Sequence, residues 1–153
     1  IESDAITYGS AINACTRGVK WQTSFVLLDA MGRTILEPNT ISYSSAISAC
    51  EKGEEWQRAF VLLATMRVVV LESDTISSNS TISACEKNAE WQRALALLEG
   101  MNKTGIESSI ISYTSVISTC EKANAWQRAL ALLAATSQVF VESNVITYNS
   151  VIS

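Results

Sequence analysis

The hydrophobic positions of the chain follow a helical pattern that returns every 35 residues. Around residues 41–52 the apolar or small side chains recur at steps of three and four, as one face of a helix requires: Tyr43, Ala46, Ile47 and Cys50. A second segment, which begins near Trp56, shows the same spacing: Ala59, Phe60, Leu63 and Met66. We therefore expect two amphipathic helices in each 35-residue unit.

Two residue types that occur once per unit fix the period. Tryptophan occurs only at Trp21, Trp56, Trp91 and Trp126, and cysteine only at Cys15, Cys50, Cys85 and Cys120. One pair of helices is too small to bury its apolar face alone, whereas stacked copies bury these faces against one another. The sequence thus predicts an all-α chain of stacked helix-turn-helix repeats.

Polar residues and glycines mark where the helices begin and end. A short turn follows the first helix of the second unit at Gly53, and Gly105 suits a helix stop. Residues that favour helix N-caps precede the first helices: Asp4, Asn39, Asp74, Ser109 and Asn144. These marks predict four complete repeats, at residues 5–39, 40–74, 75–109 and 110–144. Residues 1–4 then end a preceding repeat and residues 145–153 begin a further one, so we expect a piece of one continuous, longer array.

Composition limits the classes of partner. The chain has 153 residues, of which 48% are hydrophobic, and a net charge of −4. This apolar content is typical of globular proteins, and no apolar run approaches the roughly 20 residues of a membrane span. Nucleic-acid affinity comes largely from Lys and Arg that neutralise phosphates, and the chain offers no basic excess.

The cysteines indicate packing rather than chemistry. Equivalent positions in stacked repeats lie roughly 8–10 Å or more apart, whereas a disulfide needs Cα atoms within about 7 Å. No C-x-x-C pair and no histidine exist to complete a zinc site. We expect each cysteine to be a small buried residue at a helix contact, as free cysteine commonly is. Reduced thiols are compatible with the cytosol, the mitochondrial matrix or the plastid stroma.

The sequence contains no recognisable catalytic motif. Histidine, the commonest general base, is absent, and no glycine-rich phosphate loop is present. The acidic column Glu51, Glu86 and Glu121 is expected to form a solvated face. We therefore expect no enzymatic activity, cofactor, metal or small-molecule substrate in this segment. An enzyme domain beyond Ser153 stays open as an alternative that nothing in the sequence supports.

Three motifs carry a resemblance to a known family. They are the segment Ile-Thr-Tyr-Asn-Ser-Val-Ile-Ser at residues 146–153, the segment Ala-Leu-Ala-Leu-Leu-Glu-Gly-Met at residues 94–101, and the connector Glu37-Pro38-Asn39. With the 35-residue period, they resemble pentatricopeptide repeats of the P type over essentially the whole chain. Tetratricopeptide repeats usually have 34 residues and lack the Thr-Tyr-Asn opening. The resemblance implies a right-handed α-solenoid that binds single-stranded RNA in a mitochondrion or plastid, one base per repeat.

The resemblance also implies which residues would read the bases. The main reading column follows the aromatic position of the first helix: Gly9, Ser44, Asn79, Thr114 and Asn149. The second column is the last residue of each repeat: Asn39, Asp74, Ser109 and Asn144. In the family's code, Ser44/Asp74, Asn79/Ser109 and Thr114/Asn144 would read 5′-GCA-3′. Gly9 with Asn39 specifies no base, and Asn149 lacks its partner.

Each reading column has an alternative explanation. The second column also caps helices, so its residue types are expected there without any RNA. The main column lies inside a helix, where Gly, Ser, Asn and Thr are less favourable than Ala. It varies while its neighbours stay constant, as a reading position should. Surface drift would produce similar variation.

Two further columns fit RNA binding, each with a plainer alternative. The isoleucines match the family's residue that packs on base faces, but they would also suit packing between repeats: Ile6, Ile41, Ile76, Ile111 and Ile146. The basic residues that close each first helix would meet phosphates or complement the helix C-terminus: Arg17, Lys52, Lys87 and Lys122.

Two functions follow from these patterns. The first is sequence-specific binding of single-stranded RNA in an organelle, without catalysis. The second is a scaffold that binds protein, as an accessory subunit of an organellar ribosome or photosynthetic complex. The acidic balance and the near-identical repeats favour the scaffold, whereas the variable reading column favours RNA. We take RNA binding as the prediction, with the scaffold as its alternative.

Overall fold

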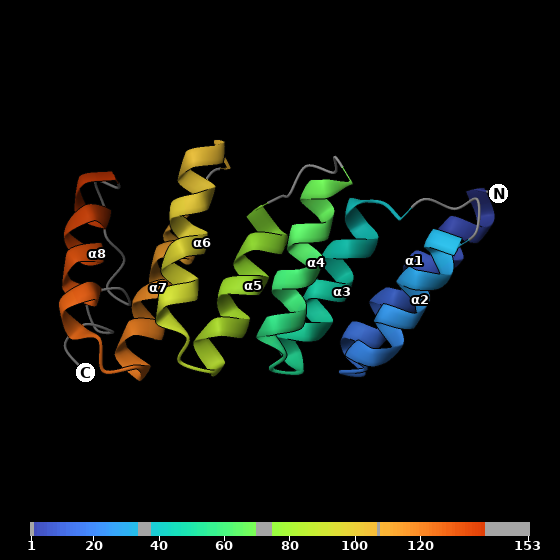
Figure 1. The fold of residues 1–153 in the computed structure, drawn as a ribbon, viewed down its shortest axis with the longest axis horizontal. Helices are drawn as coiled ribbons and strands as arrows, with labels where there is room; N and C mark the ends of the chain where they lie inside the picture. The colour runs from blue at the N-terminus through green and yellow to red at the C-terminus, as the bar shows by residue number, and fades with distance from the viewer. Residues whose placement is uncertain (1, 34–37, 70–74, 107, 140–153) are drawn as a thin grey trace. The chain divides into compact units, whose positions relative to one another are not determined.

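The computed structural model describes residues 2–33, 38–69, 75–106 and 108–139, and these residues form helices and no strand (Figure 1). The helices are α1 (Glu2–Arg17), α2 (Trp21–Arg33), α3 (Thr40–Lys52), α4 (Trp56–Val68), α5 (Thr75–Lys87), α6 (Trp91–Thr104), α7 (Ile110–Lys122) and α8 (Trp126–Val139). The predicted all-α architecture is confirmed. Among the described residues, no helix is both long and apolar enough to span a membrane.

The chain divides into two compact units, residues 1–84 and residues 85–153, with the division inside α5. In the first unit α1 packs against α2 and α3, and α3 packs against α4. In the second unit α7 packs against α6 and α8. Each unit therefore contains helices that contact both their hairpin partner and a helix of the neighbouring hairpin.

The predicted apolar faces form the interior. Four equivalent positions of the first helices, one in each of α1, α3, α5 and α7, are fully buried: Ile12, Ile47, Ile82 and Ile117. The second helices contribute a buried methionine in three places, at Met31, Met66 and Met101. Burial of one such side chain contributes roughly 1.5–3 kcal/mol. This repeated burial stabilises the stack of helices.

The turn between the two helices of each hairpin has one shape. It contains a residue with positive φ in the left-handed region, which in no case is glycine: Val19, Glu54, Ala89 and Asn124. The next residue donates its backbone N–H to a cysteine carbonyl, as in Glu55 to Cys50 at 2.9 Å and Glu90 to Cys85 at 3.0 Å. This six-to-one hydrogen bond is the Schellman ending of a helix. The cysteine position therefore also closes the first helix.

The predicted helix ends are confirmed at three places and wrong at one. Asn39 and Ser109 cap α3 and α7, and Gly105 ends α6 with a φ of 73°. Asp4 is no N-cap, because α1 begins at Glu2 and already includes it. A capping preference of about 1 kcal/mol does not by itself prevent a helix from beginning earlier. Asp74 and Asn144 lie outside the described residues.

The cysteines are buried thiols, as predicted for Cys50, Cys85 and Cys120, whereas Cys15 is half-buried. Burial raises the pKa of Cys50 to about 12, and the neighbouring Glu55 carboxylate adds to this effect while Arg58 opposes it. All four cysteines are free, and the described residues contain no cluster of three or more side chains suited to a metal. Because burial raises their pKa, the thiols of Cys50, Cys85 and Cys120 are protonated packing groups at neutral pH.

Each tryptophan opens a second helix, and Trp21 shows how this position packs. Its ring meets Phe25 edge-on, with ring centroids 6.1 Å apart. The guanidinium of Arg58, from the predicted next repeat, lies 5.5 Å from the centroid of the Trp21 ring. A Cβ atom added to Gly53 would lie 2.7 Å from Trp21 Cδ1. The indole is therefore held between neighbouring hairpins by a turn that has no room for a side chain.

Candidate functional site

An exposed isoleucine stands near the start of each first helix. The exposed fractions are 67% for Ile6, 69% for Ile41, 65% for Ile76 and 68% for Ile111. An isoleucine that packs between repeats would be buried, like Ile47 or Ile82, which are 0% exposed. The alternative that these isoleucines pack between repeats therefore does not describe these four residues. Their exposure leaves an apolar surface available to a ligand.

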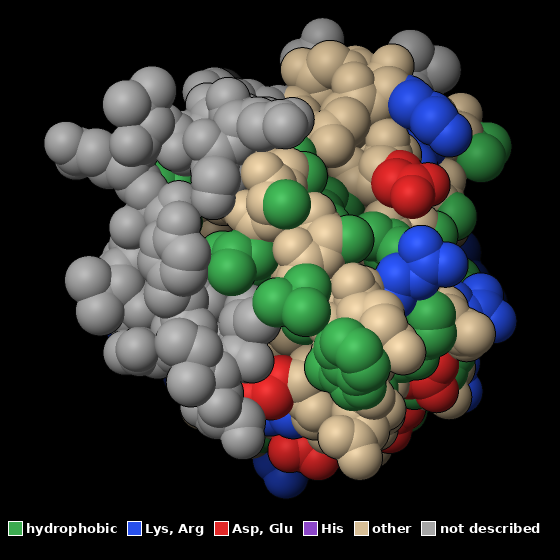
Figure 2. Space-filling view, turned by 90° about the vertical axis from the view of Figure 1, so that its left-hand side faces the viewer, with side chains coloured by type: hydrophobic (Ala, Val, Ile, Leu, Met, Phe, Trp, Pro, Cys, Tyr) green, Lys and Arg blue, Asp and Glu red, His purple; other side chains and the backbone are tan. Residues whose placement is uncertain are grey.

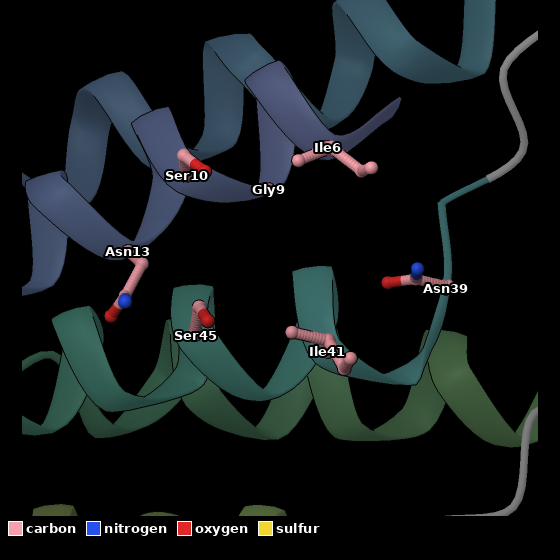
Figure 3. Close-up of a pocket in the computed structure, with 7 residues that line it drawn as sticks. All are labelled: Ile6, Gly9, Ser10, Asn13, Asn39, Ile41 and Ser45. Atoms are coloured by element: carbon pink, nitrogen blue, oxygen red, sulfur yellow. The ribbon is translucent and has the colours of Figure 1, made fainter. Parts of the chain in front are cut away.

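A pocket of about 540 Å³ lies between α1 and α3 in the first unit (Figure 3). The residues that line it come from α1, from α3 and from the N-cap of α3: Ile6, Gly9, Ser10, Asn13, Asn39, Ile41 and Ser45. No charged side chain is among them. The pocket thus brings together two predicted stacking residues and both members of the first predicted reading pair. Its volume lies in the range typical of ligand sites.

Gly9 leaves one wall of this pocket open. A Cβ atom added at this position would meet nothing within 4 Å. The other reader of the pair, Asn39, accepts two hydrogen bonds at Oδ1, from the Ser42 backbone N–H and from Ser42 Oγ, each at 3.0 Å. Two donors on one atom identify it as the amide oxygen. Because the Asn39 oxygen already accepts two hydrogen bonds, the amide nitrogen is the group of Asn39 that can donate to a ligand, at the edge of the gap between α1 and α3 (Figure 3).

The predicted readers Ser44 and Thr114 are half-buried and form hydrogen bonds within their own helices. Ser44 Oγ donates to the Thr40 carbonyl at 2.7 Å, and Thr114 Oγ1 donates to the Ile110 carbonyl at 2.8 Å. A hydroxyl has only one proton to donate. Both hydroxyls have therefore used their proton and can offer a ligand only acceptor capacity, which at Ser44 Oγ is shared with Ser77 Oγ, a donor at 2.9 Å.

The other predicted readers are placed less completely. Asn79 is half-buried in α5, within the first unit, whereas Ser109 caps α7 in the second unit. Asp74, Asn144, Asn149 and the stacking residue Ile146 lie outside the described residues. The pair that would read the central base therefore has one member in each unit.

The basic column lies at the opposite end of the first helices from the predicted readers. Arg17, Lys52, Lys87 and Lys122 are exposed in the last turns of α1, α3, α5 and α7. Eight residues separate Ser44 from Lys52, or about 12 Å along a helix axis. Lys122 Nζ pairs with Glu86 Oε1 at 3.0 Å. No basic residue lines the pocket, and Lys122 has part of its charge neutralised.

The acidic column differs from the solvated face that we expected. Glu51 Oε1 accepts a hydrogen bond from Ser83 Oγ at 2.9 Å. Glu86 Oε1 accepts one from Ser118 Oγ at 3.0 Å in addition to its ion pair with Lys122. Both carboxylates thus bind the next first helix. The expectation is wrong for these two residues because partners 32 residues away are adjacent only after the helices stack.

Sequence reasoning missed the polar lining of the pocket. Ser10, Asn13 and Ser45 belong to it, but were not among the predicted readers. A signal was present, because serine recurs at one position of every first helix: Ser10, Ser45, Ser80 and Ser115. Serine is a poor choice inside a helix unless its hydroxyl has a task. An invariant serine column therefore marked a functional or packing surface.

The family comparison decides the identity of the repeats. The pentatricopeptide repeat domain matches residues 96–153, and the PPR repeat matches residues 41–68 and 76–106. The chain belongs to the pentatricopeptide repeat family. The search of curated proteins found no significant match to this chain.

Solved structures confirm the α-solenoid fold of this pentatricopeptide repeat chain. The pentatricopeptide repeat protein PPR10 from maize is similar with a TM-score of 0.87 and 18% identity, over 96% of this chain and 21% of that one. PPR10 in complex with an 18-nt psaJ RNA element is similar with a TM-score of 0.82 and 22% identity, over 96% of this chain and 22% of that one. The chain thus spans about a fifth of the length of PPR10.

Proposed function

We propose that this pentatricopeptide repeat chain binds single-stranded RNA, one base per repeat, without catalysing a reaction. The observation that carries the proposal is the exposure of Ile6, Ile41, Ile76 and Ile111. Such residues gain from covering a flat apolar base face, and stacking contacts contribute roughly 1–3 kcal/mol per base. Family membership supports an organelle, a mitochondrion or plastid, as the compartment. The maize protein that shares the fold was crystallised with RNA, which supports the same class of ligand.

The proposed base readers stand beside these isoleucines. Ile41 and Ser44 share one face of α3, since residues three apart are neighbours on a helix. The pairs Ser44/Asp74, Asn79/Ser109 and Thr114/Asn144 are proposed to select guanine, cytosine and adenine, so that the core target is 5′-GCA-3′. In the first repeat, Asn39 contributes a hydrogen-bond donor. Gly9, at the main reading position, has no side chain and adds no base preference.

The charge of the chain shapes the expected binding. A net charge of −4 and the Glu86–Lys122 pair leave few basic groups for phosphates. For single strands the logarithm of affinity falls with the logarithm of salt by about 0.7 for each neutralised phosphate. With Arg17, Lys52, Lys87 and Lys122 as the proposed phosphate contacts, the slope should not exceed about 3. Base contacts then supply most of the selectivity.

Binding to short RNAs tests the proposal. The chain should bind single-stranded RNA that contains GCA several-fold more tightly than a scrambled sequence, measured by fluorescence anisotropy at stated low salt. Three decodable repeats give weak affinity, so the ratio between the two RNAs is the decisive quantity. Ile41→Asp should reduce binding to both RNAs, because it removes an apolar contact and adds a charge that repels phosphates. Equal binding of the two RNAs by the unchanged chain would contradict the sequence specificity.

A protein-binding scaffold is the second candidate, and exposed apolar residues on the second helices favour it. Val26, Val61 and Trp126 are 67%, 57% and 59% exposed. Figure 2 views the molecule from the side on which α8 lies in Figure 1, and hydrophobic side chains are exposed among polar ones there. A protein partner that binds the exposed apolar residues of α4 should be lost in Val61→Asp and retained in Ile41→Asp. RNA binding should respond in the opposite way.

A further inference from the structure

A buried serine recurs at the third residue of the predicted repeats, one position after the exposed isoleucine. Ser42, Ser77 and Ser112 are 1%, 0% and 0% exposed. They have no direct access to a ligand, so they cannot read a base themselves. Each nevertheless has a hydrogen bond to a proposed reader, and that reader belongs to the preceding repeat.

The bond of Ser77 is the most informative, because it joins two first helices. Ser77 Oγ in α5 donates to Ser44 Oγ in α3 at 2.9 Å, and Ser44 Oγ donates to the Thr40 carbonyl at 2.7 Å. The two bonds form a chain that runs in one direction, and successive hydrogen bonds of this kind strengthen one another. They fix both the side-chain orientation of Ser44 and the direction in which its proton points.

The other two serines act on the second reading column. Ser42 donates through both N and Oγ to Asn39 Oδ1, each at 3.0 Å. Ser112 Oγ accepts the backbone N–H of Ser109 at 3.1 Å and lies 3.4 Å from Ser109 Oγ. Capping explains the backbone parts of these contacts. The side-chain contact additionally engages the oxygen of Asn39 and leaves its amide nitrogen for a base, and at Ser109 it engages the hydroxyl.

We propose that Ser42, Ser77 and Ser112 are positioning residues, each of which sets the hydrogen-bonding group that a reader of the preceding repeat presents to the RNA base. This inference rests on the proposed function. Its consequence is that the specificity of a repeat depends on a buried residue of the next repeat as well as on the reading pair. The residue types in this column are Ser or Thr throughout the chain, at Thr7, Ser42, Ser77, Ser112 and Thr147.

The test uses Ser77→Ala, with Ser83→Ala as a matched control in the same helix. Ser83 Oγ also reaches the preceding first helix, where it donates to Glu51 Oε1 at 2.9 Å, but it does not contact a reader. Binding is measured on RNAs that carry each of the four bases at the position paired with Ser44. Ser77→Ala should lower the preference for guanine there about fivefold, the worth of one net hydrogen bond. The preferences at the other two positions should not change.

A control variant and a conservative variant show whether the effect comes from the Ser77 hydroxyl. Ser83→Ala should leave all three preferences unchanged, and Ser77→Thr should retain the preference for guanine because it keeps the hydroxyl. Thermal unfolding of each variant checks that the fold is intact. An unchanged guanine preference in Ser77→Ala, while the unchanged chain discriminates bases, overturns the positioning role alone. Absence of any base preference in the unchanged chain overturns the proposed function and this inference together.

Discussion

The two ends of each first helix differ in burial, in variability and in the partners of their side chains. At the N-terminal end of α3, Ile41 is exposed and Ser44 is half-buried beside it. At the C-terminal end, Cys50 is fully buried and its carbonyl closes the turn to α4. The variable reading position thus lies beside a constant isoleucine where a ligand can reach both, whereas the constant cysteine lies where the hairpins pack. Base selection and stability should therefore respond to substitutions at different ends of one helix.

The two ends should differ most in their effect on the free energy of unfolding when one carboxylate is introduced at each end. Cys50→Asp places an unpaired charge in the interior and should lower the free energy of unfolding by about 4 kcal/mol. Ile41→Asp, at the exposed end, should change that free energy by less than about 0.5 kcal/mol while it weakens RNA binding. Urea denaturation of both variants measures the difference. Similar losses of stability would show that the two ends are not distinct.

Alkaline pH should weaken the packed end selectively. The pKa values of Cys50 and Cys85 are raised to about 12, chiefly by burial, from an ordinary value near 9. Above pH 9 the unfolded chain loses these protons while the folded chain keeps them, so the free energy of unfolding falls as pH rises. The loss should reach about 1.4 kcal/mol for each thiol at pH 10. Below about pH 8 the thiols contribute almost no pH dependence, because they are protonated in both the folded and the unfolded chain.

The double variant Cys50→Ala with Cys85→Ala isolates this effect from the titration of lysines and tyrosines. Its free energy of unfolding should fall less between pH 8 and pH 10 than that of the unchanged chain, as measured by urea denaturation at each pH. The same fall in both proteins would refute the assignment to the thiols.

Glycine-to-alanine substitutions should have opposite signs at the two ends. A Cβ atom at Gly53 would lie 2.7 Å from Trp21 Cδ1, and such overpacking costs about 1–3 kcal/mol. A Cβ atom at Gly9 meets nothing within 4 Å, so Gly9→Ala should stabilise α1 by about 0.5–1 kcal/mol. Thermal unfolding of the two variants gives the comparison. A stabilised Gly53→Ala variant would contradict the close packing of the turn against Trp21.

The sequence predicted the periodic parts of the molecule well, because spacing along a helix determines which side chains share a face. The burial of Ile47 and Cys50 and the caps at Asn39 and Ser109 follow from spacing and residue type alone. The exposure of Ile41 does not follow from spacing and residue type, since isoleucine suits both a core and a stacking surface.

Ser78 shows another limit of prediction from the sequence. It stands where Tyr43 and Tyr113 stand in the neighbouring repeats, and its hydroxyl is buried without a hydrogen-bond partner.

Contacts between repeats could not be predicted from the sequence. The bonds Ser77–Ser44 and Ser83–Glu51 join residues 32 or 33 positions apart. They depend on how far one helix is displaced along the next, and no local pattern encodes that displacement. The polar wall of the pocket, including Asn13, was missed for the same reason. Periodic serines were visible, but their partners became apparent only in three dimensions.

Exchange of one reading pair tests the central claim most directly. Asn79→Thr combined with Ser109→Asn gives the third repeat the readers that Thr114 and Asn144 provide in the fourth. Affinities are compared for two RNAs, one with 5′-GCA-3′ and one with 5′-GAA-3′, at the same low salt. The unchanged chain should prefer GCA and the double variant GAA, each by about fivefold. A double variant that still prefers GCA, or that binds both RNAs equally while the unchanged chain discriminates, would contradict base reading by these residues.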